Sequence, residues 1–91
     1  MTPKFSLGQV VATPGALEAL RLAHQSAAFF LDRHAAGDWG EVCDEDKQYN
    51  ERDLINGERL LSAYTTLLDV KIWVFTEGDR SSTSIILPEE Y

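Results

Sequence analysis

The chain has 91 residues, of which 44% are hydrophobic and 25% are charged, and its formal net charge is −7. These proportions are typical of a globular protein, and the length fits a single domain spanning residues 1–91. The negative charge disfavours direct binding of nucleic acid, because phosphates are bound by neutralising them with Lys and Arg. It favours a basic protein as partner, or it serves only to keep the chain soluble.

No uninterrupted apolar run approaches the ~20 residues needed to cross a bilayer. Residues 1–11 lack the apolar core of a signal peptide. The single cysteine, Cys43, excludes an internal disulfide, which agrees with a reducing compartment. We therefore expect a cytoplasmic protein that does not bind a membrane.

The N-terminal part of the chain is predicted to form a short strand and then a helix. Residues 9–12 include two adjacent valines, which favour a strand. Thr13 is a suitable N-cap, and Pro14 suits the first turn of a helix. Leu17 and Leu20, three residues apart, give that helix an apolar face.

A second helix is expected after Ser26, which is also a suitable N-cap. Phe30 and His34 are four residues apart and therefore share one face of this helix. Gly37 fits the left-handed position that ends many helices. His34 is then expected near the helix end, where a positively charged side chain is mildly favoured.

The loop Asp38-Trp39-Gly40-Glu41 follows, and two interpretations of its tryptophan are open. In the first, Trp39 folds back over the seam between helices and sheet and donates its indole N–H to a backbone carbonyl. In the second, Trp39 is an exposed anchor for a partner, flanked by the carboxylates of Asp38 and Glu41.

A third helix is expected to begin near the acidic run Asp44-Glu45-Asp46, which complements a helix dipole, and to end at Asn56-Gly57. Its apolar face is thin, so we expect a mostly exposed helix, or a helical turn, lying over a sheet edge. The acidic run lacks the central glycine and the ligand spacing of an EF-hand, so it does not predict a calcium site.

The last third of the chain is rich in β-branched and aromatic residues, which predicts strands in residues 59–67, 70–77 and 82–88. The short links between them favour an antiparallel meander. The predicted fold class is therefore α+β, with two to three short helices packed on one face of a small antiparallel three-stranded meander. The N-terminal strand is an optional addition to that sheet.

The middle strand of this meander has apolar residues on both faces. Ile72, Val74 and Thr76 point to one face, whereas Trp73 and Phe75 point to the other. Helices can cover only one face of a single sheet in a chain this short. We expect the N-terminal segment, a partner protein or a second copy to cover the other face, so a homodimer through the sheet face is one expectation.

The sequence contains no recognisable cofactor or metal motif. His24, His34 and Cys43 are too scattered for a zinc site, which needs four ligands in close pairs. Phosphate-binding glycine loops and the Gly-x-Ser-x-Gly elbow are also missing from the sequence. We therefore predict no cofactor and no metal.

One acid–base set remains as an alternative: His34, Arg59, Tyr64, Glu77 and Arg80. Small RNA-cleaving toxins of the RelE/ParE class share the order strand, helix pair and sheet, and often use Arg, Tyr and His or Lys on that sheet. The net charge of −7 opposes such an activity, because its electrostatic steering has the wrong sign for RNA. Arg80 also fits a hairpin link in which it pairs with Glu77 or with Asp79.

Several stretches together resemble a small bacterial family whose members are labelled hypothetical or plasmid-related proteins of mobile elements. The stretches are Ala12–Leu20, Arg33-His34 with Gly37–Gly40, Gly57–Tyr64, Lys71–Glu77 and Asp79–Tyr91. The resemblance implies an accessory protein of plasmids and integrated elements, and it implies no catalytic set or cofactor. Members often begin a helix with Asp-Pro where this chain has Cys43-Asp44, which weakens any special role for Cys43.

Two functional hypotheses follow. The first is a non-enzymatic acidic accessory protein that binds another protein, in a sharper form as a nucleic-acid mimic or anti-defence factor. The alternative is a RelE/ParE-like nucleic-acid hydrolase using the His/Arg/Tyr set. The candidate binding residues are Asp38, Trp39, Glu41, Arg59, Tyr64, Trp73, Phe75 and Arg80.

Overall fold

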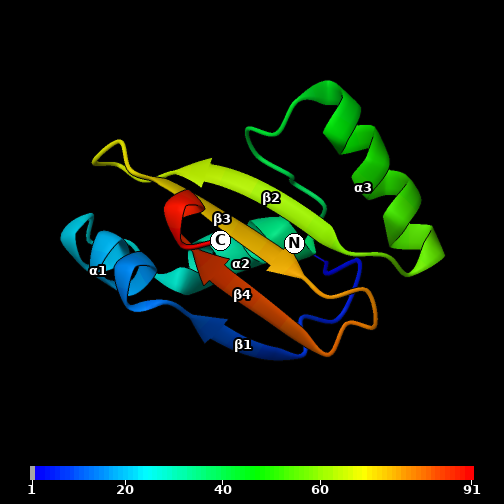
Figure 1. Cartoon of the computed structure of the whole chain (residues 1–91), viewed down its shortest axis with the longest axis horizontal. Helices are drawn as coiled ribbons and strands as arrows, with labels where there is room; N and C mark the ends of the chain where they lie inside the picture. The colour runs from blue at the N-terminus through cyan, green and yellow to red at the C-terminus, as the bar shows by residue number, and fades with distance from the viewer. Residues whose placement is uncertain (1) are drawn as a thin grey trace.

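The computed structural model describes residues 2–91 and shows within them three α-helices and a four-stranded sheet (Figure 1). The fold is α+β, as expected. In chain order the elements are β1 (Gln9–Ala12), α1 (Pro14–Leu22), α2 (Ala27–Ala35), α3 (Asp44–Asn56), β2 (Leu60–Thr65), β3 (Lys71–Thr76), β4 (Ser82–Ile86) and the short 3₁₀ helix η1 (Pro88–Glu90). None of the helices in the described part of the chain has the length and apolar character needed to span a bilayer.

The strands lie in the order β1-β4-β3-β2. The expected antiparallel meander is present as β2, β3 and β4. The optional N-terminal strand also joins the sheet, as β1, but its parallel pairing with β4, with Gln9 opposite Ser82, was not predicted. The sheet is therefore mixed. A parallel partner so far along the chain leaves no local pattern in a four-residue strand.

The helix ends follow the expected capping residues. The hydroxyl of Thr13 accepts the backbone N–H of Ala16 at the start of α1, and that of Ser26 accepts the N–H of Phe29 at the start of α2. Gly57 ends α3 with φ of 74°, a left-handed conformation that glycine adopts at low cost.

The hydrophobic core lies between the sheet and the two helices α1 and α2, and Figure 1 shows α2 behind the sheet. Its largest side chains are fully buried: Phe30, Tyr64, Ile72, Val74 and Ile85. Complete burial of a side chain of this size stabilises the fold by roughly 1.5–3 kcal/mol. We call this side of the sheet the inner face.

The outer face of the sheet carries Trp73 and Phe75, and the C-terminal residues cover part of it. The ring of Tyr91 lies 5.7 Å from Trp73 and 5.9 Å from Phe75, measured between ring centroids. The N-terminal segment was the cover expected within the chain. It lies instead on the helix side, where the N–H of Lys4 donates to the carbonyl of Ala35 at 2.7 Å.

Helix α3 lies beside the β2 edge of the sheet, as its thin apolar face predicted (Figure 1). The buried amide of Asn50 donates to the carbonyl of Leu61 at 2.8 Å and accepts its N–H at 3.2 Å. The N–H of Ala63 donates to the carbonyl of Trp39, and its carbonyl accepts the N–H of Glu41. These contacts satisfy backbone groups that an edge strand would otherwise leave free.

Candidate functional site

The eight binding residues selected from the sequence lie in three separate parts of the structure. The loop before α3 contains Asp38, Trp39 and Glu41. The outer face of the sheet carries Arg59, Trp73 and Phe75. The other two, Tyr64 and Arg80, are engaged in internal contacts.

Trp39 is a buried residue with 4% of its surface exposed. Its indole N–H donates to the carboxylate of Glu51 in α3 at 3.0 Å, not to a backbone carbonyl as expected. Its ring stacks on Phe5 at 6.2 Å and meets the edge of His34 at 5.8 Å. Trp39 therefore joins the loop, α3 and the N-terminal segment, and it offers almost no surface to a partner.

The two carboxylates beside Trp39 are occupied within the chain. Asp38 pairs with Arg33 at 2.7 Å, and this hydrogen bond holds the pKa of Asp38 below its ordinary value. Glu41 accepts the hydroxyl of Thr65 at 2.8 Å and lies 3.6 Å from the ammonium of Lys71. The loop is thus fixed to its neighbours and is not a preformed acidic pocket.

Tyr64 is locked on the inner face. Its hydroxyl donates to the backbone carbonyl of Asp38 at 2.6 Å, and the guanidinium of Arg33 lies 4.5 Å from its ring centroid. Burial raises the pKa of Tyr64 to about 12. A phenol that is buried, neutral and already hydrogen-bonded is a structural group.

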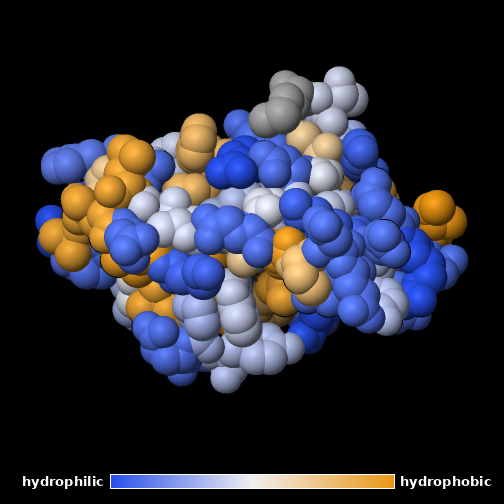
Figure 2. Space-filling model, turned by 90° about the horizontal axis from the view of Figure 1, so that it is seen from above, coloured by the Kyte–Doolittle hydropathy of each residue, from blue (hydrophilic) through white to orange (hydrophobic). Residues whose placement is uncertain are grey.

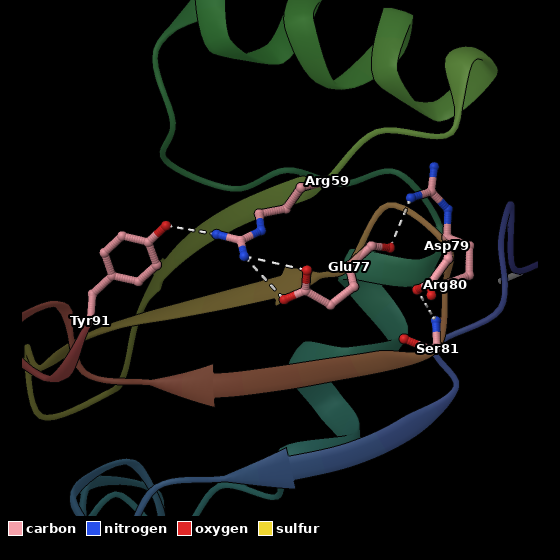
Figure 3. Close-up of polar contacts among 6 residues, drawn as sticks. All are labelled: Arg59, Glu77, Asp79, Arg80, Ser81 and Tyr91. Atoms are coloured by element: carbon pink, nitrogen blue, oxygen red, sulfur yellow. Dashed lines mark hydrogen bonds and ion pairs between the residues drawn. The ribbon is translucent and has the colours of Figure 1, made fainter.

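Arg59 organises the polar contacts of the outer face (Figure 3). Its guanidinium lies 4.9 Å from the centroid of Phe75 and donates to both carboxylate oxygens of Glu77, at 3.1 and 3.3 Å. It also donates to the hydroxyl of Tyr91 at 2.7 Å. The structure therefore brings Arg59, Phe75 and Trp73 together under Tyr91. The ion pair is exposed and contributes roughly 0–1 kcal/mol.

Arg80 does not pair with a carboxylate, contrary to the expectation from the sequence. Its guanidinium donates to backbone carbonyls: to Glu58 at 2.6 Å, to Asp53 at 3.2 Å, and to Glu77 and Gly78 within its own turn. Figure 3 shows Arg80 pointing away from Arg59. Arg80 joins the end of α3 to the β3–β4 hairpin, and its guanidinium N–H groups are used in hydrogen bonds within the chain.

His34 lies at the centre of a buried polar network that sequence reasoning missed. Its Nδ1 is 2.6 Å from the hydroxyl of Ser62, and its Nε2 is 2.9 Å from that of Thr76. The Thr76 hydroxyl is 2.7 Å from that of Thr83, which donates to the carbonyl of Leu7 at 2.7 Å. All four side chains have no exposed surface.

The direction of each hydrogen bond in this network follows from proton counting. The carbonyl of Leu7 can only accept, so the single proton of the Thr83 hydroxyl is used there. Thr76 must then donate to Thr83, and His34 must donate its Nε2–H to Thr76. Its unprotonated Nδ1 accepts from Ser62. This count fixes the proton on Nε2. Burial, with the nearby charge of Arg80, lowers the pKa of His34 from 6.5 to about 4, so at pH 7 the imidazole is neutral and Nδ1 is the acceptor. His34 lies in the last turn of α2, as expected, but it does not carry the positive charge that is favoured there.

The His/Arg/Tyr set does not meet in one cleft. His34 and Tyr64 are buried on the inner face, Arg59 lies on the outer face, and Arg80 binds carbonyls at the hairpin. The Ser62–His34 pair has the contact of a nucleophile with its base, but neither group is accessible to a substrate. Among residues 2–91, no three His, Cys, Asp or Glu side chains gather to hold a metal ion.

The most exposed hairpin of the sheet carries two adjacent leucines. Strand β2 ends at Thr65, and the chain turns through residues 66–69 before β3. The N–H of Thr66 donates to the carbonyl of Val70 at 2.8 Å, and Asp69 adopts φ of 63°. Leu67 and Leu68 occupy the centre of this turn, where polar residues, Gly or Pro are usual. They are 79% and 57% exposed. We call these two residues the leucine tip.

The leucine tip is held in place at the link between α1 and α2. The N–H of Leu67 donates to the side chain of Gln25, in the link between α1 and α2, at 2.9 Å. Leu22 and Phe29, within four residues of Gln25, are each about half exposed. Figure 2 shows hydrophobic atoms gathered at this end of the molecule, where α1 and the β2–β3 turn lie. Much of the surface seen in that view is hydrophilic.

Comparisons with family models, with curated proteins and with solved structures found no match to this chain.

Proposed function

We propose that the chain is a non-enzymatic protein-interaction domain and that the leucine tip is its anchor. The observation that supports this most strongly is the exposure of Leu67 and Leu68, 79% and 57%, at the end of an ordered hairpin. Large apolar side chains gathered at one exposed place are typical of interaction sites. Because Thr66, Asp69 and Gln25 already fix the turn, little conformational entropy is lost on binding.

The shape of this region and the net charge of the chain support one kind of partner. A protruding hairpin fits a concave apolar groove in a folded protein. The chain carries a net charge of −7, so a groove with a basic rim is favoured over an acidic one. The resemblance to plasmid-related proteins supports the further proposal that the partner belongs to a mobile element or to its host.

The nucleic-acid mimic is the less favoured form of this proposal. A mimic needs carboxylates on one face, spaced like phosphates. Here the carboxylates lie on all three α-helices and on several loops, and those of Glu18, Asp38 and Glu77 are paired with arginines. Charge distributed in this way supports solubility more than imitation of a polyanion.

Site-specific photo-crosslinking in the native cell tests the anchor. A photoreactive side chain is placed at Leu67, at Leu68 and, as control, at Ile55, which is 85% exposed on α3. We expect one discrete crosslinked protein from positions 67 and 68 and none from position 55. The purified partner is then titrated with the double variant Leu67→Ser, Leu68→Ser and with Ile55→Ser.

The double variant is expected to weaken binding by about 100-fold, the loss for two anchor side chains worth about 1–2 kcal/mol each. Ile55→Ser should leave the affinity unchanged. Equal crosslinking from all three positions, or an unchanged affinity of the double variant, would contradict the proposal. Both substituted leucines are exposed, so the variant should unfold at the same urea concentration as the parent.

A further inference from the structure

The two edges of the sheet differ in how their backbone is covered. The β2 edge is covered by Asn50 and by the loop before α3, as described above. The β1 edge has no such cover. Figure 1 shows β1 at the lower boundary of the molecule, with no described element beyond it. Val10 and Val11 are 43% and 47% exposed there.

The pairing of β1 with β4 determines which backbone groups remain free. The N–H of Gln9 donates to the carbonyl of Ser81, and that of Thr13 donates to Ile85. The backbone N–H and C=O groups of a strand point to alternate sides from one residue to the next, so those of Val11 also point towards β4. The N–H and C=O groups of Val10 and Ala12 therefore point away from the sheet. Four strong hydrogen-bonding groups form a short template for another strand.

The β1 edge also lacks the charges that usually prevent strand addition. Proteins commonly protect a free edge with lysine or another charged residue. Residues 5–17, which contain β1, carry no Asp, Glu, Lys or Arg, although the chain as a whole has a net charge of −7. Two copies of such an acidic chain repel each other over most of their surface. At the β1 edge they can approach without placing like charges on opposing strands.

We propose that this edge pairs with the β1 strand of a second copy, antiparallel and about a two-fold axis at Val11. This register places Val10 opposite Ala12 of the second copy, and each such pair exchanges two hydrogen bonds. All four free backbone groups of each chain are then satisfied. The two Val11 side chains meet on the outer face of the continuous sheet. Each also lines an apolar cavity of about 260 Å³ beside Phe75 and Tyr91, so the apolar surface continues across the axis.

The dimer is expected to be weak, because the interface contains one short strand from each chain. A strand pair of this size buries less than the roughly 1,000 Å² of a stable interface, which predicts a dissociation constant on the order of 0.1 mM. Sedimentation equilibrium over chain concentrations up to about 1 mM covers that range. The wild-type chain should move from monomer to dimer across this series, and no larger species should form.

A charge exchange at the two-fold axis tests the register. Val11→Lys and Val11→Glu each place like charges opposite each other, so either variant alone should be monomeric over the same series. An equimolar mixture should form a heterodimer, because Lys and Glu then face each other. Ile55→Lys changes charge in the same way as Val11→Lys, but on α3, and should dimerise like the parent. Circular dichroism checks that each variant is folded.

A second variant does not depend on charge. Val10→Pro removes an N–H that points away from β4, so the domain can fold, but each chain loses one hydrogen bond that it donates to the second copy, two in the dimer. It should reduce dimerisation at least about fivefold. A wild-type chain that stays monomeric throughout overturns the proposal and leaves the edge to a strand of a different protein. The proposal is also overturned if Val11→Lys alone forms dimers, or if the equimolar mixture of Val11→Lys and Val11→Glu forms no heterodimer.

Discussion

The Nδ1 atom of His34 lies 2.6 Å from the hydroxyl of Ser62, inside a core where neither side chain is exposed. In a hydrolase such a pair lies in an open cleft, because the serine must reach its substrate. Here the pair continues through Thr76 and Thr83 to the carbonyl of Leu7. It joins α2, three strands and the N-terminal segment, so its effect is on stability.

The first prediction is that stability decreases with acid before the carboxylates titrate. The pKa of His34 is about 4 in the native state and keeps its ordinary value of 6.5 when unfolded. Between these values the unfolded chain binds more protons than the native chain. The contribution of neutral His34 is therefore complete above pH 6.5 and is lost as the pH falls towards 4. The total loss is about 3 kcal/mol.

Urea unfolding between pH 7 and about pH 5 measures this effect, because most Asp and Glu side chains titrate near pH 4. His34→Gln should remove the slope in that window. His24→Gln is the matched control, because His24 is exposed in the α1–α2 link, and it should retain the slope. A flat profile for the parent chain would show that His34 is not kept neutral by the fold.

The second prediction concerns Thr76, which accepts from His34 and donates to Thr83. Thr76→Val keeps the shape but removes the hydroxyl, so the imidazole N–H loses its acceptor in a buried site. The free energy of unfolding should fall by about 2–3 kcal/mol. Thr65→Val removes a hydroxyl that bonds to Glu41 at the surface, and should change it by less than about 0.5 kcal/mol. Equal effects would contradict the contribution of the buried network to stability.

Local patterns predicted much of this fold. The caps Thr13 and Ser26 and the terminator Gly57 act through residues within five positions, so the sequence shows them directly. The alternation in residues 72–76 likewise predicted two apolar faces. The position of β1 beside β4 could not be predicted, because it depends on a contact between opposite ends of the chain.

The candidate sites were harder to predict. Leu67 fell within the predicted strand 59–67, since these residues contain no Gly, Pro or Asn to mark a turn, whereas Leu68 fell in the link before the next strand. Thr66 and Asp69 form the turn. The His34 network did leave a signal. Ser62, Thr76 and Thr83 fall on the inner face at alternate positions beside apolar residues, which indicates a buried polar partner.

The third prediction compares two glycines with almost the same backbone conformation. Gly40 has φ of +72° and Gly57 has φ of +74°. A Cβ at Gly40 would lie 2.0 Å from the carbonyl oxygen of Ala63 and 2.7 Å from the ring of Tyr64, whereas at Gly57 the nearest atom is 3.9 Å away. Gly57→Ala should therefore cost only the left-handed backbone penalty, about 1–2 kcal/mol.

Gly40→Ala adds a steric clash to the same penalty, and the loop must leave the β2 edge to relieve it. We expect a loss above about 3 kcal/mol in urea unfolding, with faster amide exchange at Ala63, whose N–H donates to Trp39. If the two variants lose similar free energies of unfolding, the loop moves away from Ala63 at no energetic cost, and its close contact with Ala63 does not stabilise the fold.

The fourth prediction separates the two roles considered for Trp39. Its surface is 4% exposed, and its indole N–H donates to Glu51. Trp39→Ala should lower the free energy of unfolding by about 3–5 kcal/mol, the usual cost of emptying a buried aromatic site. Trp73→Ala removes the same side chain from the half-buried outer face and should cost less. If Trp39→Ala has the same free energy of unfolding as the parent chain, the indole does not stabilise the fold, and the result favours its role as an anchor for a partner.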